Sequence, residues 1–227
     1  MNIPKLSKRL RAAADLVRPQ AFVADVGTDH AYLPIVLLSE GKIRGGVVSD
    51  IHRGPIDRAR AHIAACGMTD RLTPILCDGL SELRAYAPED ILILGMGGEL
   101  IASILHAAPW VRDPQIRLIL QPMTHAELLR GYLWREGFDI TEERLVKEEK
   151  IYQILCATYT GVPQDTTETE RMFGKQNLLR RDGLTEELLA HWSGVLSKRK
   201  AAKQAAGVDT AEEDAMLEEI HRIGETP

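Results

Sequence analysis

The 227-residue chain has the composition of an ordinary globular protein, with 44% hydrophobic residues, 27% charged residues and a formal net charge of −5. This length accommodates one sizeable core and a smaller appendage. The longest apolar runs fall far short of the roughly 20 residues that a membrane span needs. The first residues lack the continuous apolar core of a secretory signal. We therefore expect a cytoplasmic protein with no membrane segment.

Metal sites and disulfides are not expected, because the three cysteines and seven histidines show no ligand spacing. The acidic net charge argues against coating nucleic acid by bulk attraction. Basic residues nevertheless cluster in two segments, 1–20 and 171–203. Each cluster is either a solvated helix face or a contact surface. The oligomeric state is left open, with a monomer favoured.

The chain begins with an amphipathic segment and then alternates strands with helices. Leu6, Leu10, Ala13 and Val17 recur at helical spacing, which predicts a helix with its charges on the outer face. Five nearly continuous Val, Ile and Leu runs follow, as expected of parallel strands that are buried on both faces. These runs are residues 21–26, 46–49, 73–77, 90–94 and 117–120. The pattern predicts an α/β fold with a doubly wound, mostly parallel sheet.

Two closely spaced extended segments, 138–149 and 150–161, permit only antiparallel pairing, so the sheet should end in a β-hairpin. The polar stretch 162–169 then predicts a linker. Helical spacing resumes from Leu184 to Leu196 and from Met216 to Ile223, with an interruption at "AAGVD". We therefore predict a catalytic domain over residues 1–162 and a helical hairpin over 163–227. The hairpin would be marginal alone and should pack against the main domain or form a short coiled coil.

The turn after the first strand, "DVGTDH", is the most informative motif. Asp25 ends the strand and Gly27 makes the turn, but Asp29 and Ala31 stand where a GxGxxG loop keeps glycines for a pyrophosphate. A carboxylate repels pyrophosphate and attracts a cation. S-Adenosylmethionine carries an ammonium and a sulfonium without a phosphate, so the loop points to this cofactor. The alternative is that Asp29 only caps the following helix.

Further polar residues end the second and third strands. Asp50 follows Asp25 by 25 residues, near the ~20-residue spacing of a ribose-binding acidic side chain. Asp78 and Gly79, beside Cys77, suit an acceptor for the exocyclic amine of adenine, although Asp-Gly is also a common turn. Ligands bind at the carboxyl ends of the strands in such sheets. These positions together predict a nucleoside-containing cofactor.

The fourth and fifth strands end in "ILGMGG" and "LILQP". The glycines of the fourth block allow close approach of the backbone to a ligand. Gln121 and Pro122 offer an amide and a rigid rim at the end of the fifth strand. Five informative strand ends in order are more specific than any single motif.

These blocks, "ADVGTDHAYLP", "SD", "CDGL", "ILGMGG" and "LILQP", resemble the bacterial TrmK family over the whole chain. The resemblance implies a Rossmann-like class I methyltransferase domain and a C-terminal helical, coiled-coil-like domain. It also implies methyl transfer from S-adenosylmethionine to N1 of the adenine at position 22 of tRNA. The family's fifth block often reads "LQPN", so Met123 puts an amide contact to the target base at that position in doubt.

The hypothesis assigns a role to each site residue. Asp29 is the predicted catalytic residue, since a carboxylate can stabilise the charge that moves from sulfur to base and can later accept the proton of the exocyclic amine; His30 is a weaker candidate. The predicted cofactor-binding residues are Asp25, Gly27, Thr28, Asp29, His30, Asp50, Ile51, Cys77, Asp78, Gly79 and Gly95. The predicted substrate-binding residues are Gly97, Gln121, Pro122, Lys8 and Arg11. The adenine must swing out of the RNA helix, and the basic clusters are expected to hold the tRNA.

Three other functions are compatible with parts of the pattern. A methyltransferase acting on another RNA, a protein or a small molecule would share the fold and the cofactor loop. A nicotinamide-dependent oxidoreductase is disfavoured because Asp29 would face the pyrophosphate. A catalytically silent RNA-binding protein would keep the pocket but transfer no methyl group.

Overall fold

The computed structural model describes residues 3–225 and divides into two compact units, Met1–Gln164 and Asp165–Pro227. Residues 1–2 and 226–227, which the predicted domain limits include, lie outside the described residues. The boundary between the units lies within the polar stretch 162–169. No helix in the described part of the chain combines the length and the apolar character needed to cross a membrane.

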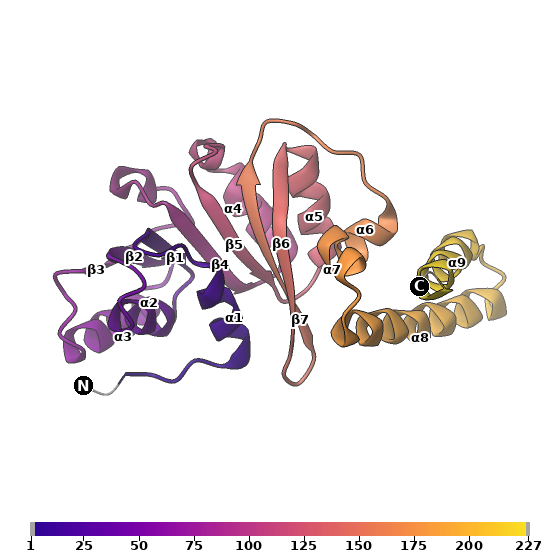
Figure 1. The fold of residues 1–227 in the computed structure, drawn as a ribbon, viewed down its shortest axis with the longest axis horizontal. Helices are drawn as coiled ribbons and strands as arrows, with labels where there is room; N and C mark the ends of the chain where they lie inside the picture. The colour runs from indigo at the N-terminus through magenta and orange to yellow at the C-terminus, as the bar shows by residue number, and fades with distance from the viewer. Residues whose placement is uncertain (1–2, 226–227) are drawn as a thin grey trace. The chain divides into compact units, whose positions relative to one another are not determined.

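The first unit is built on a seven-stranded sheet with the order β3-β2-β1-β4-β5-β7-β6 (Figure 1). Strands β1 to β5 pair in parallel, and β7 pairs antiparallel with both β5 and β6. The strands are β1 (Phe22–Val26), β2 (Gly45–Asp50), β3 (Leu72–Leu76), β4 (Asp90–Met96), β5 (Arg117–Pro122), β6 (Phe138–Lys147) and β7 (Ile151–Tyr159). The predicted parallel sheet with a closing hairpin is confirmed.

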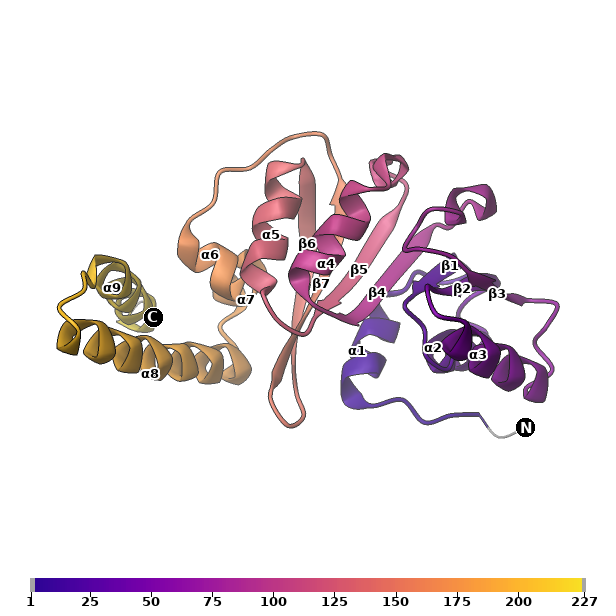
Figure 2. The same ribbon diagram turned by 180° about the vertical axis from the view of Figure 1, so that it is seen from behind.

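Helices cover both faces of this sheet, as Figures 1 and 2 show. They are α1 (Lys8–Leu16), α2 (Tyr32–Ser39), α3 (Arg53–Ala65), α4 (Gly98–His106) and α5 (Ala126–Arg135), with short 3-10 helices η1 (Leu83–Tyr86) and η2 (Pro109–Val111). One buried core joins the sheet to α1, α2 and α3, and the other joins it to α4 and α5. Apolar side chains alternate between these two cores, which explains why the strands are hydrophobic on both faces.

Helix α1 differs from its prediction in where its charges lie. Ser7 caps its first turn by accepting a hydrogen bond from the Leu10 amide at 3.3 Å, so Leu6 precedes the helix. Ala13, Ala14 and Leu16 form the buried face. The guanidinium of Arg9, however, reaches inward to the end of β5 instead of staying on the outer face. A helical wheel shows only the spacing along one helix and cannot show such long-range contacts.

The second unit consists of helices α6 (Glu168–Phe173), α7 (Lys175–Arg180), α8 (Gly183–Ala205) and α9 (Ala211–Glu225). Thr167 and Glu170 form a capping box at the start of α6. Asp182 caps α8 by accepting the Thr185 amide at 2.9 Å. Helices α8 and α9 pack together, and Leu196 and Ile220 are buried. The interruption at residues 205–209 matches the turn between them.

Candidate active site at the carboxyl edge of the sheet

The turn after β1 is held tightly against the end of β2. The amides of Gly27 and Thr28 both donate to the carbonyl of Ser49, at 2.8 and 3.0 Å. Gly27 has a φ of 77°, and a Cβ there would lie 2.0 Å from Cε of Met96 at the end of β4. A side chain at this position would therefore be strained and would collide with Met96. The glycine allows the first loop to lie against the ends of β2 and β4.

Asp25 is a buried acid at the base of this turn, with 7% of its surface exposed. Burial raises its pKa to about 6, and a hydrogen bond with the Thr28 side chain partly opposes this rise. The Thr28 hydroxyl also accepts the Ala31 amide at 3.0 Å. Thr28 therefore links the buried acid to the start of helix α2.

Asp29 lies in the open part of the loop, where 60% of its side chain is exposed. Its carboxylate forms an ion pair with Arg58 and lies 2.9 Å from Nε2 of His30. The hydrogen bond with Arg58 is the main reason why the pKa of Asp29 is lowered. Asp29 does not cap helix α2, whose N-cap is Ala31 in a left-handed conformation without a side-chain cap. The capping alternative is therefore wrong.

Asp29 contacts Arg58 and His30, and His30 belongs to a group of three stacked rings; sequence reasoning missed this arrangement. The rings of His30, Tyr32 and His62 stack on one another with centroids 4.9 to 5.3 Å apart. Arg58 and His62 lie one turn apart on α3, so the i, i+4 spacing was the only available signal. The cluster anchors the loop to α3 on the side of the sheet that carries β2 and β3.

The ends of β2 and β3 supply polar and apolar surface next to this loop. Asp50 accepts the His52 amide at 2.7 Å, and its own carbonyl accepts the Cys77 amide at 3.1 Å. Ile51 is 56% exposed. Asp78 is exposed, whereas Cys77 is buried. This edge therefore presents two carboxylates and one apolar side chain.

The ends of β4 and β5 are joined through one amide side chain. Oε1 of Gln121 accepts the Gly95 amide at 3.2 Å and the guanidinium of Arg9, while Nε2 donates to the Pro122 carbonyl at 2.8 Å. Gln121 is fully buried. Its side chain therefore supports the turn at Gly95 from within instead of lining the rim, and Pro122 is buried beside it.

The loops after β4 and β5 also fit closely together. The Gly98 amide donates to the Thr124 carbonyl at 2.8 Å, and the Met123 amide donates to the Met96 carbonyl at 2.7 Å. A Cβ on Gly98 would lie 2.1 Å from the His125 carbonyl oxygen. The glycine at position 98 thus allows two backbone segments to pack where a side chain would not fit.

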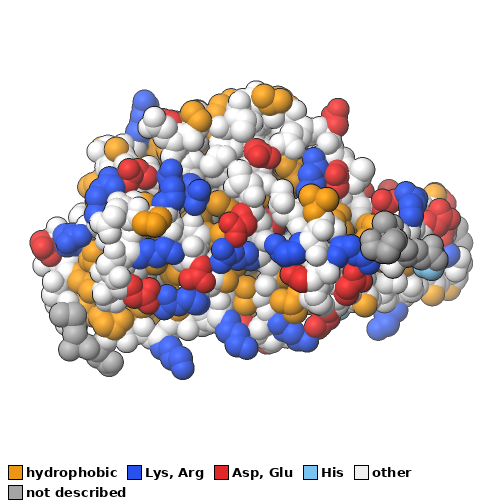
Figure 3. Space-filling view, viewed as in Figure 1, with side chains coloured by type: hydrophobic (Ala, Val, Ile, Leu, Met, Phe, Trp, Pro, Cys, Tyr) orange, Lys and Arg blue, Asp and Glu red, His pale blue; other side chains and the backbone are white. Residues whose placement is uncertain are grey.

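The predicted basic clusters are largely neutralised by ion pairs. In helix α1, Lys8 is exposed, but Arg11 forms a bidentate pair with Glu40 at 2.8 and 2.9 Å. In the second unit, the ion-paired residues include Arg171, Arg180, Arg181, Lys200 and Lys203. Lys198 and Arg199 are exposed and form no ion pair within residues 3–225. Figure 3 shows basic and acidic side chains interspersed over one face of the molecule.

Comparison with known proteins identifies the family of the first unit. The sequence pattern of a methyltransferase domain matches residues 6–155. The chain belongs to the methyltransferase-domain family. The chain is also 37% identical over 158 residues to the tRNA (adenine(22)-N(1))-methyltransferase of Bacillus subtilis, an alignment that spans 69% of this chain and 66% of that protein. The resemblance to the TrmK family that the motifs predict is confirmed.

Solved structures resemble this methyltransferase over nearly its full length. A Streptococcus agalactiae protein of the NADB-Rossmann superfamily is 30% identical, with a TM-score of 0.89 and 97% coverage of both chains. A putative tRNA (m1A22) methyltransferase from Streptococcus pneumoniae, solved in complex with S-adenosyl-L-methionine, is 28% identical. Its TM-score is 0.84, with coverage of 95% of this chain and 99% of that chain.

Within residues 3–225 of this methyltransferase, no group of three or more His, Cys, Asp or Glu side chains is arranged to hold a metal ion.

Proposed function

We propose that this methyltransferase transfers the methyl group of S-adenosylmethionine to N1 of the adenine at position 22 of tRNA. The observation that carries the proposal is the first loop. It places the exposed carboxylate of Asp29 where a dinucleotide-binding loop would receive a pyrophosphate. The similarity to the Bacillus subtilis enzyme supports the choice of acceptor.

The residues at the carboxyl edge fit this cofactor. The buried Asp25 provides negative charge for the ammonium group of the methionine part, and Asp29 provides it for the positive charge that moves from sulfur to base. The half-buried carboxylate of Asp50 and the exposed carboxylate of Asp78 provide hydrogen-bond acceptors for the ribose and for the adenine amine, respectively. The exposed side chain of Ile51 provides an apolar surface for the adenine ring.

When bound, S-adenosylmethionine supplies an electrophilic methyl group, whose transfer to the N1 lone pair breaks the carbon–sulfur bond and leaves a neutral thioether. The positive charge then lies on the base until its exocyclic amine loses a proton to water. An aspartate is ionised at neutral pH, and the hydrogen bond with Arg58 lowers the pKa of Asp29 further. This property suits electrostatic stabilisation of the positive charge better than proton abstraction, since a base works best with a pKa near the working pH.

The tRNA must be held while the adenine is unstacked, because N1 lies on the pairing edge. We assign Lys8 on α1 to this contact, together with Lys198 and Arg199 on α8. These cations are exposed and available for phosphate groups. The role of residues 163–227 is accordingly to bind tRNA. With tRNA as the substrate, we expect the reaction to take place in the cytoplasm.

The decisive experiment is incubation of the protein with methyl-labelled S-adenosylmethionine and unmodified tRNA, followed by mapping of the labelled nucleotide. We expect label on adenine 22 and none on a tRNA with guanine at that position. Label elsewhere, or only on another acceptor, would contradict the proposed substrate. Calorimetry with NAD is the control for the cofactor, because the Asp29 loop should give no tight NAD binding.

A further inference from the structure

Arg9 of helix α1 lies at the end of strand β5, where it contacts Gln121, one of the predicted substrate-binding residues. Its Nη1 donates to Oε1 of Gln121, the same oxygen that accepts the Gly95 amide at 3.2 Å. Since Gln121 is fully buried, its amide orientation is fixed by these partners. Arg9 and the turn after β4 therefore share one hydrogen-bond acceptor.

The tip of the β6–β7 hairpin holds Arg9 from the other side. The Arg9 amide donates to Oε1 of Glu148 at 2.9 Å, and its guanidinium carbon lies 5.2 Å from the centre of the Tyr152 ring. Lys150 at the same tip donates to the Met123 carbonyl at 3.0 Å. Helix α1, the loop after β5 and the hairpin tip thus meet around one side chain.

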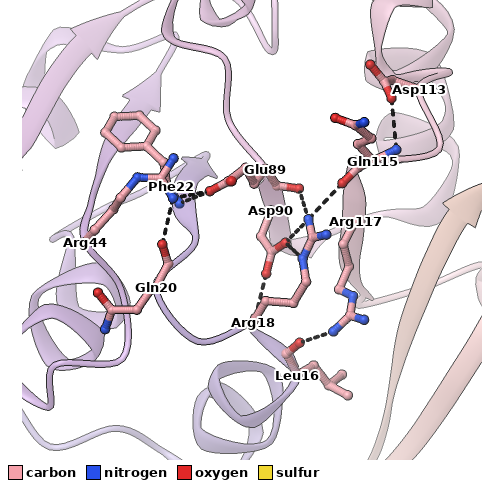
Figure 4. Close-up of polar contacts among 10 residues, drawn as sticks. All are labelled: Leu16, Arg18, Gln20, Phe22, Arg44, Glu89, Asp90, Asp113, Gln115 and Arg117. Atoms are coloured by element: carbon pink, nitrogen blue, oxygen red, sulfur yellow. Dashed lines mark hydrogen bonds and ion pairs between the residues drawn. The ribbon is translucent and has the colours of Figure 1, made fainter.

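The opposite end of α1 is fixed to the amino ends of the strands, as Figure 4 shows. The guanidinium of Arg18 donates to the buried carboxylate of Asp90 at 2.6 Å, and also to the carbonyls of Glu89 and Gln115. Arg117 donates to the Leu16 carbonyl at 3.1 Å. The helix is anchored at both ends, so the starting point of the Arg9 side chain is fixed by the fold.

The Gly95 turn interrupts the regular pairing of β4 with β5. Gly95 is exposed with a φ of 80°, and the register between β4 and β5 is interrupted between Leu94 and Met96. A Cβ on Gly95 would lie 3.7 Å from Nη1 of Arg9, so the guanidinium faces the turn. Nε of Arg9 is buried and has no hydrogen-bond partner among the described residues.

We propose that Arg9 is a positioning residue for methyl transfer: through Gln121 it holds the Gly95 turn, which is predicted to bind the cofactor, in the conformation that aligns the methyl group with the acceptor base. The proposal rests on the proposed function for the identity of the acceptor. The proposal gives helix α1 a role other than binding phosphate groups. The guanidinium of Arg9 contacts Gln121 and the Tyr152 ring, so its partners are protein groups. Orientation of the reactants contributes strongly to such displacements, and a shift of about 1 Å can cost on the order of 100-fold in rate.

The kinetic test compares Arg9→Ala, Arg9→Lys and Gln121→Ala in the full chain, with tRNA and S-adenosylmethionine. We expect Arg9→Ala to lower kcat by roughly 10- to 100-fold, while KM for tRNA changes less than about threefold. Arg9→Lys should recover part of kcat, since it keeps one donor for Gln121. If Arg9 acts through Gln121, the double variant Arg9→Ala/Gln121→Ala should have a kcat little lower than that of Arg9→Ala alone. Arg60→Lys, whose arginine pairs with Asp57 on α3, is the matched control and should retain full kcat.

A second measurement does not depend on activity. Amide hydrogen exchange of Gly95, followed by NMR, should accelerate in Arg9→Ala, whereas the Gly27 amide, bonded to Ser49, should not change. Unchanged Gly95 exchange, or a kcat within about twofold of wild type, would overturn the proposal. A rise in KM for tRNA at unchanged kcat would show a phosphate contact and would overturn it as well. Label on a different acceptor would refute the proposed function and leave the exchange result to decide the role of Arg9.

Discussion

Replacement of the buried acid Asp25 by asparagine should change how the stability of the protein depends on pH. The carboxyl has a pKa of about 6 in the folded protein against 3.8 as the reference value, because burial disfavours its charge. The folded state therefore binds this proton more tightly than the unfolded state. Protonated Asp25 therefore contributes stability that is fully present below about pH 4. This contribution is lost as the pH rises through about 6.

The size of the effect follows from the same two values. A rise from 3.8 to about 6 corresponds to about 3 kcal/mol of free energy. The asparagine side chain of the variant does not titrate and keeps an oxygen for the Thr28 side chain. The wild type should therefore lose up to about 3 kcal/mol of its free energy of unfolding, relative to Asp25→Asn, as the pH rises from about 4 to about 7.5.

Urea unfolding of both proteins without cofactor, at intervals between these pH values, measures this difference. The variant Asp70→Asn removes an exposed carboxylate and controls for the loss of one charge. A difference that stays constant over the whole pH range would refute the reasoning. With cofactor added, Asp25→Asn should bind about 10- to 100-fold more weakly if the carboxylate receives the ammonium group.

Three further predictions concern catalysis, tRNA binding and the anchoring of α1. Asp29→Ala should lower kcat by about 100-fold or more and change cofactor affinity far less, and normal turnover at saturating cofactor would exclude the assigned role. Deletion of residues 163–227 should leave S-adenosylmethionine binding intact and weaken tRNA binding in a filter or gel-shift assay. Equal tRNA affinity of the two proteins would contradict this. Arg18→Ala should lower the free energy of unfolding by about 3 kcal/mol in urea, since it leaves the buried Asp90 without its guanidinium partner.

The sheet and the set of strand ends could be predicted because both follow from local patterns. Nearly continuous apolar runs such as residues 90–94 are expected only where a strand is buried on both faces, and the structure buries them between two cores. The carboxyl ends of parallel strands share one edge, so residues at the ends of different strands are brought together without further information. Asp25 and Asp50 were placed by this rule alone.

The partners of the site residues could not be predicted, because they come from distant parts of the chain. Arg58 meets Asp29 only after α3 packs against β2, and Arg9 meets Gln121 across 112 residues. The orientation of the Gln121 side chain could not be predicted either. Its position at a strand end suggests an exposed amide, but β5 continues through Pro122 and the side chain turns inward.

The order of the strands has a consequence for biosynthesis. Strand β7 is the last to leave the ribosome, yet it lies between β5 and β6 and forms the outer neighbour of β5. Until residue 159 has emerged, β5 offers unpaired backbone groups along one side, the kind of edge that recruits other chains into aggregates. Nascent chains that stall before this point are therefore the species most in need of a chaperone.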